Sequence, residues 1–119
     1  MHEIGIASSI LECVAAEALR HPGAQILAVG VRIGELAAVD QDALDFAFEC
    51  ITRDTEWEHL KLEVAWCPRR QKCLQCSEEF FVPDLSLVCP RCGAEKYTTI
   101  GGTELDIAYL ELEERCAKP

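Results

Sequence analysis

Two cysteine pairs, Cys73-x-x-Cys76 and Cys89-x-x-Cys92, constrain this 119-residue chain more than any other feature. The C-x2-C spacing lets one tight turn aim two sulfurs at one point, and two such turns supply the four thiolates of a tetrahedral zinc site. Gly93 follows Cys92 and can take the positive φ that a turn around a metal often requires. Two disulfides, or thiols that are merely buried, are the alternatives. Because a four-sulfur site has no open coordination position, we expect a structural Zn(II) ion and not a catalytic one.

The composition is typical of a small globular protein. Half of the residues are hydrophobic, enough for a real core, and the length fits one domain, alone or with a small appendage. The chain begins Met-His-Glu-Ile-Gly, with no basic region and no long apolar run. We therefore expect neither a secretory signal nor a transmembrane segment. Four of the eight cysteines belong to the two pairs, so a reducing cytoplasm fits better than a secreted disulfide scaffold.

The charge distribution argues against nucleic acid as a partner. The formal net charge is −10, and residues 1–66 hold 12 acidic and 4 basic residues. Residues 67–96 hold 4 acidic and 5 basic residues, with one short basic run at 69–72. A nucleic-acid binder needs a concentrated positive surface, and a solvated turn explains the basic run better. We expect no nucleic-acid partner and no membrane partner.

Two helices are predicted in the first half of the chain. In residues 4–20 the apolar side chains recur at helical spacing, and His21-Pro22-Gly23 ends the segment. Residues 41–53 show the same period, with Asp40 placed as the N-cap.

Alternating apolar residues predict strands at 26–33 and 60–66, each buried on one face. A further strand is predicted at 105–112, but the phase of its apolar residues slips, which indicates a bulge near Ala108-Tyr109 or burial on both faces. Phe80-Phe81-Val82 forms a short candidate strand beside the cysteines.

These elements predict an α+β fold (of α/β type), in which a small mixed sheet carries two helices and a zinc-ribbon-like zinc domain is inserted before the last strand. We assign residues 1–66 with 103–119 to the α/β domain and residues 67–102 to the zinc domain. The inserted segment is too small to be held by burial alone, so a metal has to supply the missing stability.

The N-terminus is the second unusual feature. A bulky residue at position 2 hinders removal of Met1, so the α-amine of Met1, the amide nitrogen of His2 and the His2 imidazole can chelate one metal in fused rings. Such nitrogen ligands in a tetragonal plane suit Ni(II) or Cu(II). The alternative is that these residues are fraying terminal residues without a role.

Four segments together resemble one known family. Met1-His2-Glu3 at the terminus, Ile33-Gly34-Glu35-Leu36 after a strand, Leu44-Asp45-Phe46-Ala47-Phe48-Glu49 in a helix and the two CxxC pairs are similar, in order, to the HypA/HybF family. These are nickel-incorporation proteins for [NiFe]-hydrogenase maturation. The resemblance implies a two-domain metallochaperone, not an enzyme, that carries Ni(II) as transient cargo. It also implies two partners: the maturation GTPase HypB and the hydrogenase large subunit.

The resemblance also implies roles for individual residues. His2 is the primary nickel ligand, and Glu3 belongs to the same motif as a ligand or as a group that contacts one. Some members of the family have an acidic residue at the position of Asp40, close to the nickel site, although we favour a helix-capping role for Asp40. The zinc ligands are Cys73, Cys76, Cys89 and Cys92. Cys67 lies six residues before the first pair and is left out, because paired CxxC turns have the better geometry.

Two other functions fit the cysteine pairs. One is a zinc-ribbon interaction module that binds nucleic acid or transcription machinery, which the net charge disfavours. The other is a rubredoxin-like redox protein, because sulfur spacing does not separate iron from zinc. We find no nucleophile–base pair and no phosphate loop that indicates an enzyme.

Overall fold

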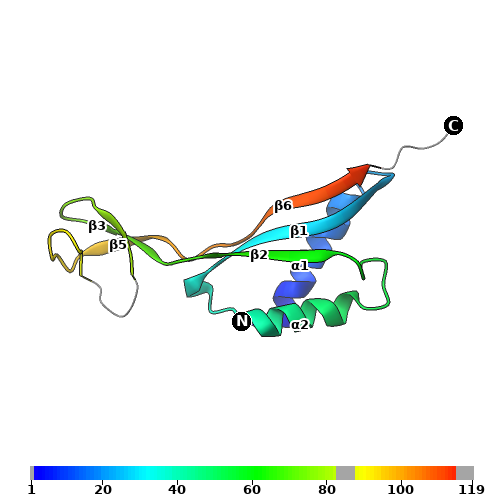
Figure 1. Cartoon of the computed structure of the whole chain (residues 1–119), viewed down its shortest axis with the longest axis horizontal. Helices are drawn as coiled ribbons and strands as arrows, with labels where there is room; N and C mark the ends of the chain where they lie inside the picture. The colour runs from blue at the N-terminus through cyan, green and yellow to red at the C-terminus, as the bar shows by residue number, and fades with distance from the viewer. Residues whose placement is uncertain (1, 83–87, 115–119) are drawn as a thin grey trace. The chain divides into compact units, whose positions relative to one another are not determined.

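The computed structural model describes residues 2–82 and 88–114, which form two helices, one 3-10 helix and two three-stranded sheets (Figure 1). The first sheet has the strand order β2-β1-β6 and the second β4-β3-β5. The predicted α+β class, with two helices, small mixed sheets and an inserted four-cysteine segment, is confirmed. None of the helices in these residues is long and apolar enough to cross a membrane. The elements are α1 (Glu3–Ala18), β1 (Ala24–Gly34), η1 (Glu35–Ala37), α2 (Gln41–Thr52), β2 (Lys61–Cys67), β3 (Arg70–Cys73), β4 (Glu79–Phe81), β5 (Tyr97–Gly101) and β6 (Leu105–Glu114).

The chain divides into two compact units. The first contains the chain up to Val31, Val39–Ala65 and the chain from Asp106 onward, and the second contains Arg32–Ala38 and Trp66–Leu105. The segment Arg32–Ala38 therefore groups with the second unit, whereas the sequence analysis assigned it to the α/β domain. The domain assignment made from the sequence stays a prediction.

Apolar side chains from both helices hold the first unit together. Figure 1 shows α1 and α2 on the same face of the β2-β1-β6 sheet. Val14 and Leu44 are completely buried on these helices, and burial of such side chains contributes about 1.5–3 kcal/mol each. The buried side chains of the helices are Ile6, Ala7, Ile10 and Val14 on α1, and Leu44, Ala47, Phe48 and Thr52 on α2.

The central strand β1 is buried on both faces along much of its length, so the predicted half-buried strand is wrong in this respect. Val29 lies on the predicted core face, but Ile26 and Ala28 of the opposite face are also buried. At Gly30, on the same face as Ile26 and Ala28, the ring of Tyr109 from β6 occupies the space that a side chain would need. The Tyr109 hydroxyl donates a 2.5 Å hydrogen bond to the carboxylate of Glu63 on β2.

The last strand keeps the phase slip seen in its sequence. Its half-buried residues are Ile107, Leu110 and Leu112, with spacings of three and then two residues. Because no residue of β6 is fully buried, the alternative of burial on both faces is wrong. The proposed bulge at Ala108-Tyr109 stays a prediction.

Gly30→Ala should destabilise the first unit. The added methyl group would overlap the Tyr109 ring, and overpacking of this kind costs about 1–3 kcal/mol. Gly5→Ala is the matched control, because a methyl group on the exposed first turn of α1 meets nothing within 4 Å. This control should be neutral or stabilising by up to about 1 kcal/mol. Urea unfolding followed by circular dichroism measures both changes, and equal midpoints for the two variants would contradict the packing of Tyr109 on Gly30.

Candidate metal centres

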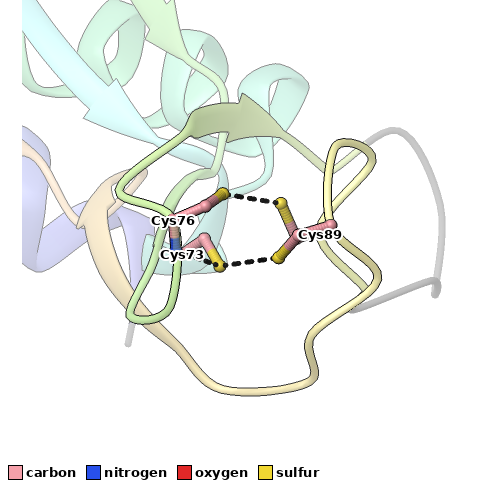
Figure 2. Close-up of side chains that lie close together, drawn as sticks. Cys73, Cys76 and Cys89 are labelled. Carbon is pink, nitrogen blue, oxygen red and sulfur yellow. Dashed lines mark hydrogen bonds between the residues drawn. The ribbon is translucent and has the colours of Figure 1, made fainter.

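The four cysteines of the CxxC pairs meet at one point in the second unit. Their Sγ atoms all lie within 4.8 Å of one another. Cys73 Sγ lies 3.5 Å from Cys92 Sγ, and Cys76 Sγ lies 3.7 Å from Cys89 Sγ. Figure 2 shows the sulfurs of the two loops pointing toward one another. Thus the structure brings together the four residues that the spacing singled out.

The two loops that carry these cysteines have the same backbone design. In the first loop the N–H of Ser77 donates to the carbonyl of Cys73 at 3.0 Å, and in the second the N–H of Gly93 donates to the carbonyl of Cys89 at 2.9 Å. The donor has a positive φ in both loops, 66° at Ser77 and 76° at Gly93. Glycine was expected to take this conformation at position 93, but the serine at position 77 carries no such signal in the sequence.

Backbone N–H groups aim at the sulfurs of the first cysteine in each pair. The N–H groups of Cys76 and Gln75 each donate to Cys73 Sγ at 3.4 Å, and the N–H of Arg91 donates to Cys89 Sγ at the same distance. The hydrogen bond from Cys76, with that from Gln75, outweighs burial and lowers the pKa of the Cys73 thiol to about 6. The loops therefore stabilise a thiolate before any metal is bound.

The pKa of the fourth thiol, that of Cys92, is shifted upward. The N–H of Ala94 lowers the pKa of Cys92, but burial and the neighbouring thiols, Cys73 among them, raise it further, to about 12. Four thiolates at this separation repel one another unless a cation lies between them. A Zn(II) ion fits this donor set, because Zn–S bonds of about 2.3 Å give S···S edges of about 3.8 Å in a tetrahedron.

The apolar support of this centre is small. Cys73 and Cys89 are buried together with Phe80 and Val82, and Cys76 and Ala94 pack against this cluster. Such a core is too small to stabilise a folded unit by burial alone. A bound metal would therefore contribute directly to the folding free energy of the second unit.

Cys67 does not belong to this group. It lies at the end of β2 and is half-buried, and among the residues that the structure describes the convergent sulfurs come only from the two pairs.

The residues predicted to bind nickel lie at the starts of the two helices. His2 is the exposed N-cap residue of α1, and its carbonyl accepts hydrogen bonds from Gly5 at 3.1 Å and Ile6 at 3.3 Å. Its imidazole makes no capping hydrogen bond and is not used by the helix. Met1, whose α-amine is a predicted ligand, lies outside the described residues.

Glu3 and Asp40 connect the first turn of α1 to the start of α2. The backbone N–H of Asp40 donates to Glu3 Oε2 at 3.0 Å, and Asp40 Oδ1 accepts from the N–H of Ala43 at 2.9 Å. The hydrogen bond from Asp40 lowers the pKa of the Glu3 carboxyl below its usual value. Asp40 thus caps α2, as favoured from its position, and the link to Glu3 sets the first turn of α1 beside this cap. Nothing in the sequence pattern indicated that link.

Backbone conformation at Ser77 and Gly93 can be tested with opposite substitutions. Gly93→Ala forces a side chain into the left-handed region, where it meets nothing within 4 Å, so the cost of about 1–2 kcal/mol is conformational. Ser77→Gly removes the same strain and should stabilise the loop. Competition with a colorimetric zinc chelator measures how readily each variant loses zinc. Gly93→Ala should lose zinc more readily than the wild type, and Ser77→Gly less readily. The same shift in both would contradict the shared design of the loops.

Comparison with known proteins identifies the family. The family model described as "Hydrogenase/urease nickel incorporation, metallochaperone, hypA" matches residues 1–112. The hydrogenase maturation factor HypA of Geobacter metallireducens is 39% identical over 113 residues, which cover 95% of this chain and 100% of the relative. The corresponding factor of Solidesulfovibrio magneticus is also 39% identical, over 118 residues and with the same coverage.

Two solved structures are similar to this chain over most of its length. The solution structure of the nickel metallochaperone HypA from Helicobacter pylori has a TM-score of 0.64 and 26% identity, and covers 97% of this chain and 100% of its own. A second solution structure of a HypA protein has a TM-score of 0.72 and 26% identity, over 97% of this chain and 98% of its own. The convergent cysteine pairs, the fold and the match over residues 1–112 agree, and the chain belongs to the HypA family of hydrogenase/urease nickel-incorporation metallochaperones.

Proposed function

We propose that this chain is a cytoplasmic nickel metallochaperone that binds Ni(II) at its N-terminus and delivers it for [NiFe]-hydrogenase maturation. The observation that carries the proposal is the family match, which begins at Met1-His2-Glu3 and runs through both cysteine pairs. The partners follow from the same family: the GTPase HypB, which supplies any energy that delivery requires, and the hydrogenase large subunit, which receives the metal. The chain itself acts as a carrier and not as an enzyme.

The nickel ligands in this proposal are the α-amine of Met1 and the amide and imidazole nitrogens of His2. The exposed His2 side chain, which makes no capping hydrogen bond, supports this choice. Glu3 and Asp40 are weaker candidates, because each carboxylate already accepts a backbone N–H. A nickel ion that recruited either one would have to compete with the contact that joins the starts of α1 and α2.

We propose that Cys73, Cys76, Cys89 and Cys92 hold a structural Zn(II) ion. The support is the donor set of four sulfurs within 4.8 Å of one another and the small apolar core around it. In this proposal the α/β domain, residues 1–66 with 103–119, binds nickel, and the inserted domain, residues 67–102, binds zinc. The closed four-sulfur site keeps its metal, whereas the terminal chelate remains open to exchange.

Purified protein should contain one zinc per chain and be colourless. X-ray absorption should show four sulfur ligands at about 2.3 Å. Removal of the metal, or Cys73→Ala, should unfold the zinc segment and leave the α/β part folded, because burial holds the latter and metal ligation the former. Amide NMR spectra with and without chelator test this difference. Visible absorption from an iron site would contradict the zinc assignment and favour the rubredoxin-like alternative, whereas nitrogen or oxygen ligands would contradict the four-cysteine ligand list.

Nickel binding should depend on His2 and on a free N-terminus. His2→Ala should abolish specific binding while leaving zinc content and fold unchanged, since residue 2 is exposed. A peptide extension before Met1 should weaken binding nearly as much, because the amine becomes an ordinary amide. Binding should also weaken as the pH falls below neutrality, because every nitrogen ligand must lose a proton. Isothermal titration calorimetry of untagged protein with Ni(II) measures all three effects.

The matched controls for His2 are the two other histidines. His21, whose imidazole lies 3.4 Å from Glu17, and His59, in the exposed turn before β2, should both tolerate replacement by alanine without loss of nickel. Unchanged affinity after N-terminal extension would remove the amine from the ligand set, and the site would then have to be built from His2 with Glu3 and Asp40.

A further inference from the structure

Helix α2 exposes a large apolar side chain that the core does not use. Phe46 is 65% exposed, although Leu44 and Phe48 on the same helix are buried. On the exposed side of α2 its neighbours are polar or charged, Asp42 one turn before it and Glu49 one turn after it. A phenylalanine placed in this way is typical of an anchor residue at a protein interface.

The first unit carries a hollow of about 230 Å³, and Phe46 is not among the residues that line it. Its buried floor is apolar and consists of Phe48 and Leu60, with the half-buried Leu62. The hydroxyl of Thr52, which also lines the hollow, donates to the carbonyl of Phe48 at 2.8 Å and is therefore satisfied. The rim is formed by three exposed carboxylates, those of Asp45, Glu49 and Glu58.

Helix geometry places Phe46 next to the rim of the hollow, because Phe46 and the rim residue Glu49 are three residues apart on α2. Asp45, Phe48, Glu49 and Thr52 follow the i, i+3, i+4, i+7 pattern of one helix face, with Leu60 and Leu62 supplied by the chain that enters β2. Phe46 projects about 100° round the helix from Asp45, and Glu49 lies between them. We call Phe46 together with this hollow the α2 surface.

The α2 surface is acidic. Glu49 forms a 3.0 Å ion pair with Arg53, and the carboxylate of Glu58 accepts the N–H of Asp54 at 3.4 Å. Within the described part of the chain the side-chain carboxylate of Asp45 makes no hydrogen bond or ion pair. The rim therefore has three carboxylates, and one guanidinium, that of Arg53, pairs with one of them. The excess negative charge favours a cationic group over the hollow.

Two other kinds of ligand fit this surface less well. Among the described residues, the group of side chains close enough to hold a metal ion is that of the four cysteines, and the rim carboxylates do not converge in this way. Nucleic acid is repelled by the negative rim. An apolar floor below a charged rim instead matches a side chain with an aliphatic stem and a cationic head, that of arginine or lysine.

We propose that the α2 surface is a docking site for a basic, apolar segment of a protein partner. An arginine or lysine of that segment lays its stem on Phe48, Leu60 and Leu62 and places its charge between the rim carboxylates. An adjacent apolar pocket of the partner receives Phe46. Charge complementarity sets the orientation, and burial of the phenylalanine ring supplies most of the affinity.

The position of this surface suits transfer of a metal. Phe46 lies six residues after Asp40, about 9 Å along the helix axis, and Asp40 is bonded to Glu3 in the first turn of α1. A partner docked here would stand next to the N-terminus. The use of the surface in nickel transfer rests on the proposed function, whereas the docking chemistry does not.

A peptide titration tests the docking chemistry. The probe is N-acetyl-arginyl-leucine amide, added to ¹⁵N-labelled full-length protein, and its control is the peptide with neutral citrulline in place of arginine. We expect saturable shifts confined to the amides of residues 45–52 and 58–62, weakened by salt and absent with citrulline. The double variant Asp45→Asn/Glu49→Gln should bind about tenfold more weakly, whereas Glu12→Gln, on the exposed side of α1, should bind as the wild type does. Equal shifts with citrulline, or in the double variant, would overturn the proposal.

A complementation experiment tests the use of the surface. Cells that lack the native gene receive the wild type, Phe46→Ala, Asp45→Asn/Glu49→Gln, or the controls Leu19→Ala and Glu12→Gln. Leu19 is the matched apolar control because it is 85% exposed just after α1. The α2-surface variants should keep nickel and zinc binding in vitro but restore several-fold less hydrogenase activity than the controls.

The outcomes separate this proposal from the proposed function. His2→Ala should lose both nickel binding and hydrogenase activity, whereas the α2-surface variants should lose activity alone. Full activity of Phe46→Ala would overturn the role in transfer. Failure of the wild type to restore activity would count against the proposed function itself, and the peptide titration then decides on the docking surface.

Discussion

Mutual repulsion of four thiolates within 4.8 Å is the constraint on which the second unit depends. The backbone N–H groups of the first loop lower the pKa of Cys73, whereas burial and the neighbouring thiols raise the pKa of Cys92. A divalent cation removes this conflict and at the same time closes both loops around one point. The strands β3, β4 and β5 are short, and the buried cluster beside them is small. A bound metal would therefore take the place of a hydrophobic core that a segment of this length cannot build.

The first unit is stabilised by a different kind of interaction. Its helices bury apolar stripes against a sheet, and the aromatic ring of Tyr109 packs on the central strand at Gly30. The hydroxyl of the same ring is bonded to Glu63, so the polar end of the tyrosine is satisfied at the surface. We therefore expect a chelator to destabilise the second unit and substitutions in the apolar core to destabilise the first, because metal ligation and apolar burial respond to different conditions.

The sequence predicted much of this structure, for identifiable reasons. The helices and the long strands have strong apolar periods, and the CxxC spacing encodes the convergence of the cysteines directly. The strands β3 and β5 were missed because Arg70–Cys73 and Tyr97–Gly101 carry no clear alternation; their conformation depends on cross-strand pairing. The packing of Tyr109 on Gly30 was also missed, since it joins residues far apart along the chain. The bond between Glu3 and Asp40 and the positive φ at Ser77 are likewise tertiary results without a local signal.

The two candidate metal centres make opposite demands on their ligands, and the chain meets them with opposite kinds of structure. A structural ion has to remain bound, and the four proposed ligands come from two hydrogen-bonded loops with buried residues at Cys73 and Cys89. A transported ion has to leave, so ligands at an exposed terminus serve better, because a partner can approach them and exchange does not require the core to open. The imidazole of His2 meets this demand, since it begins α1 but forms no capping bond. The acidic rim and Phe46 on α2, whose cap is bonded to Glu3, would then bring a basic partner to the place where the exchange has to occur.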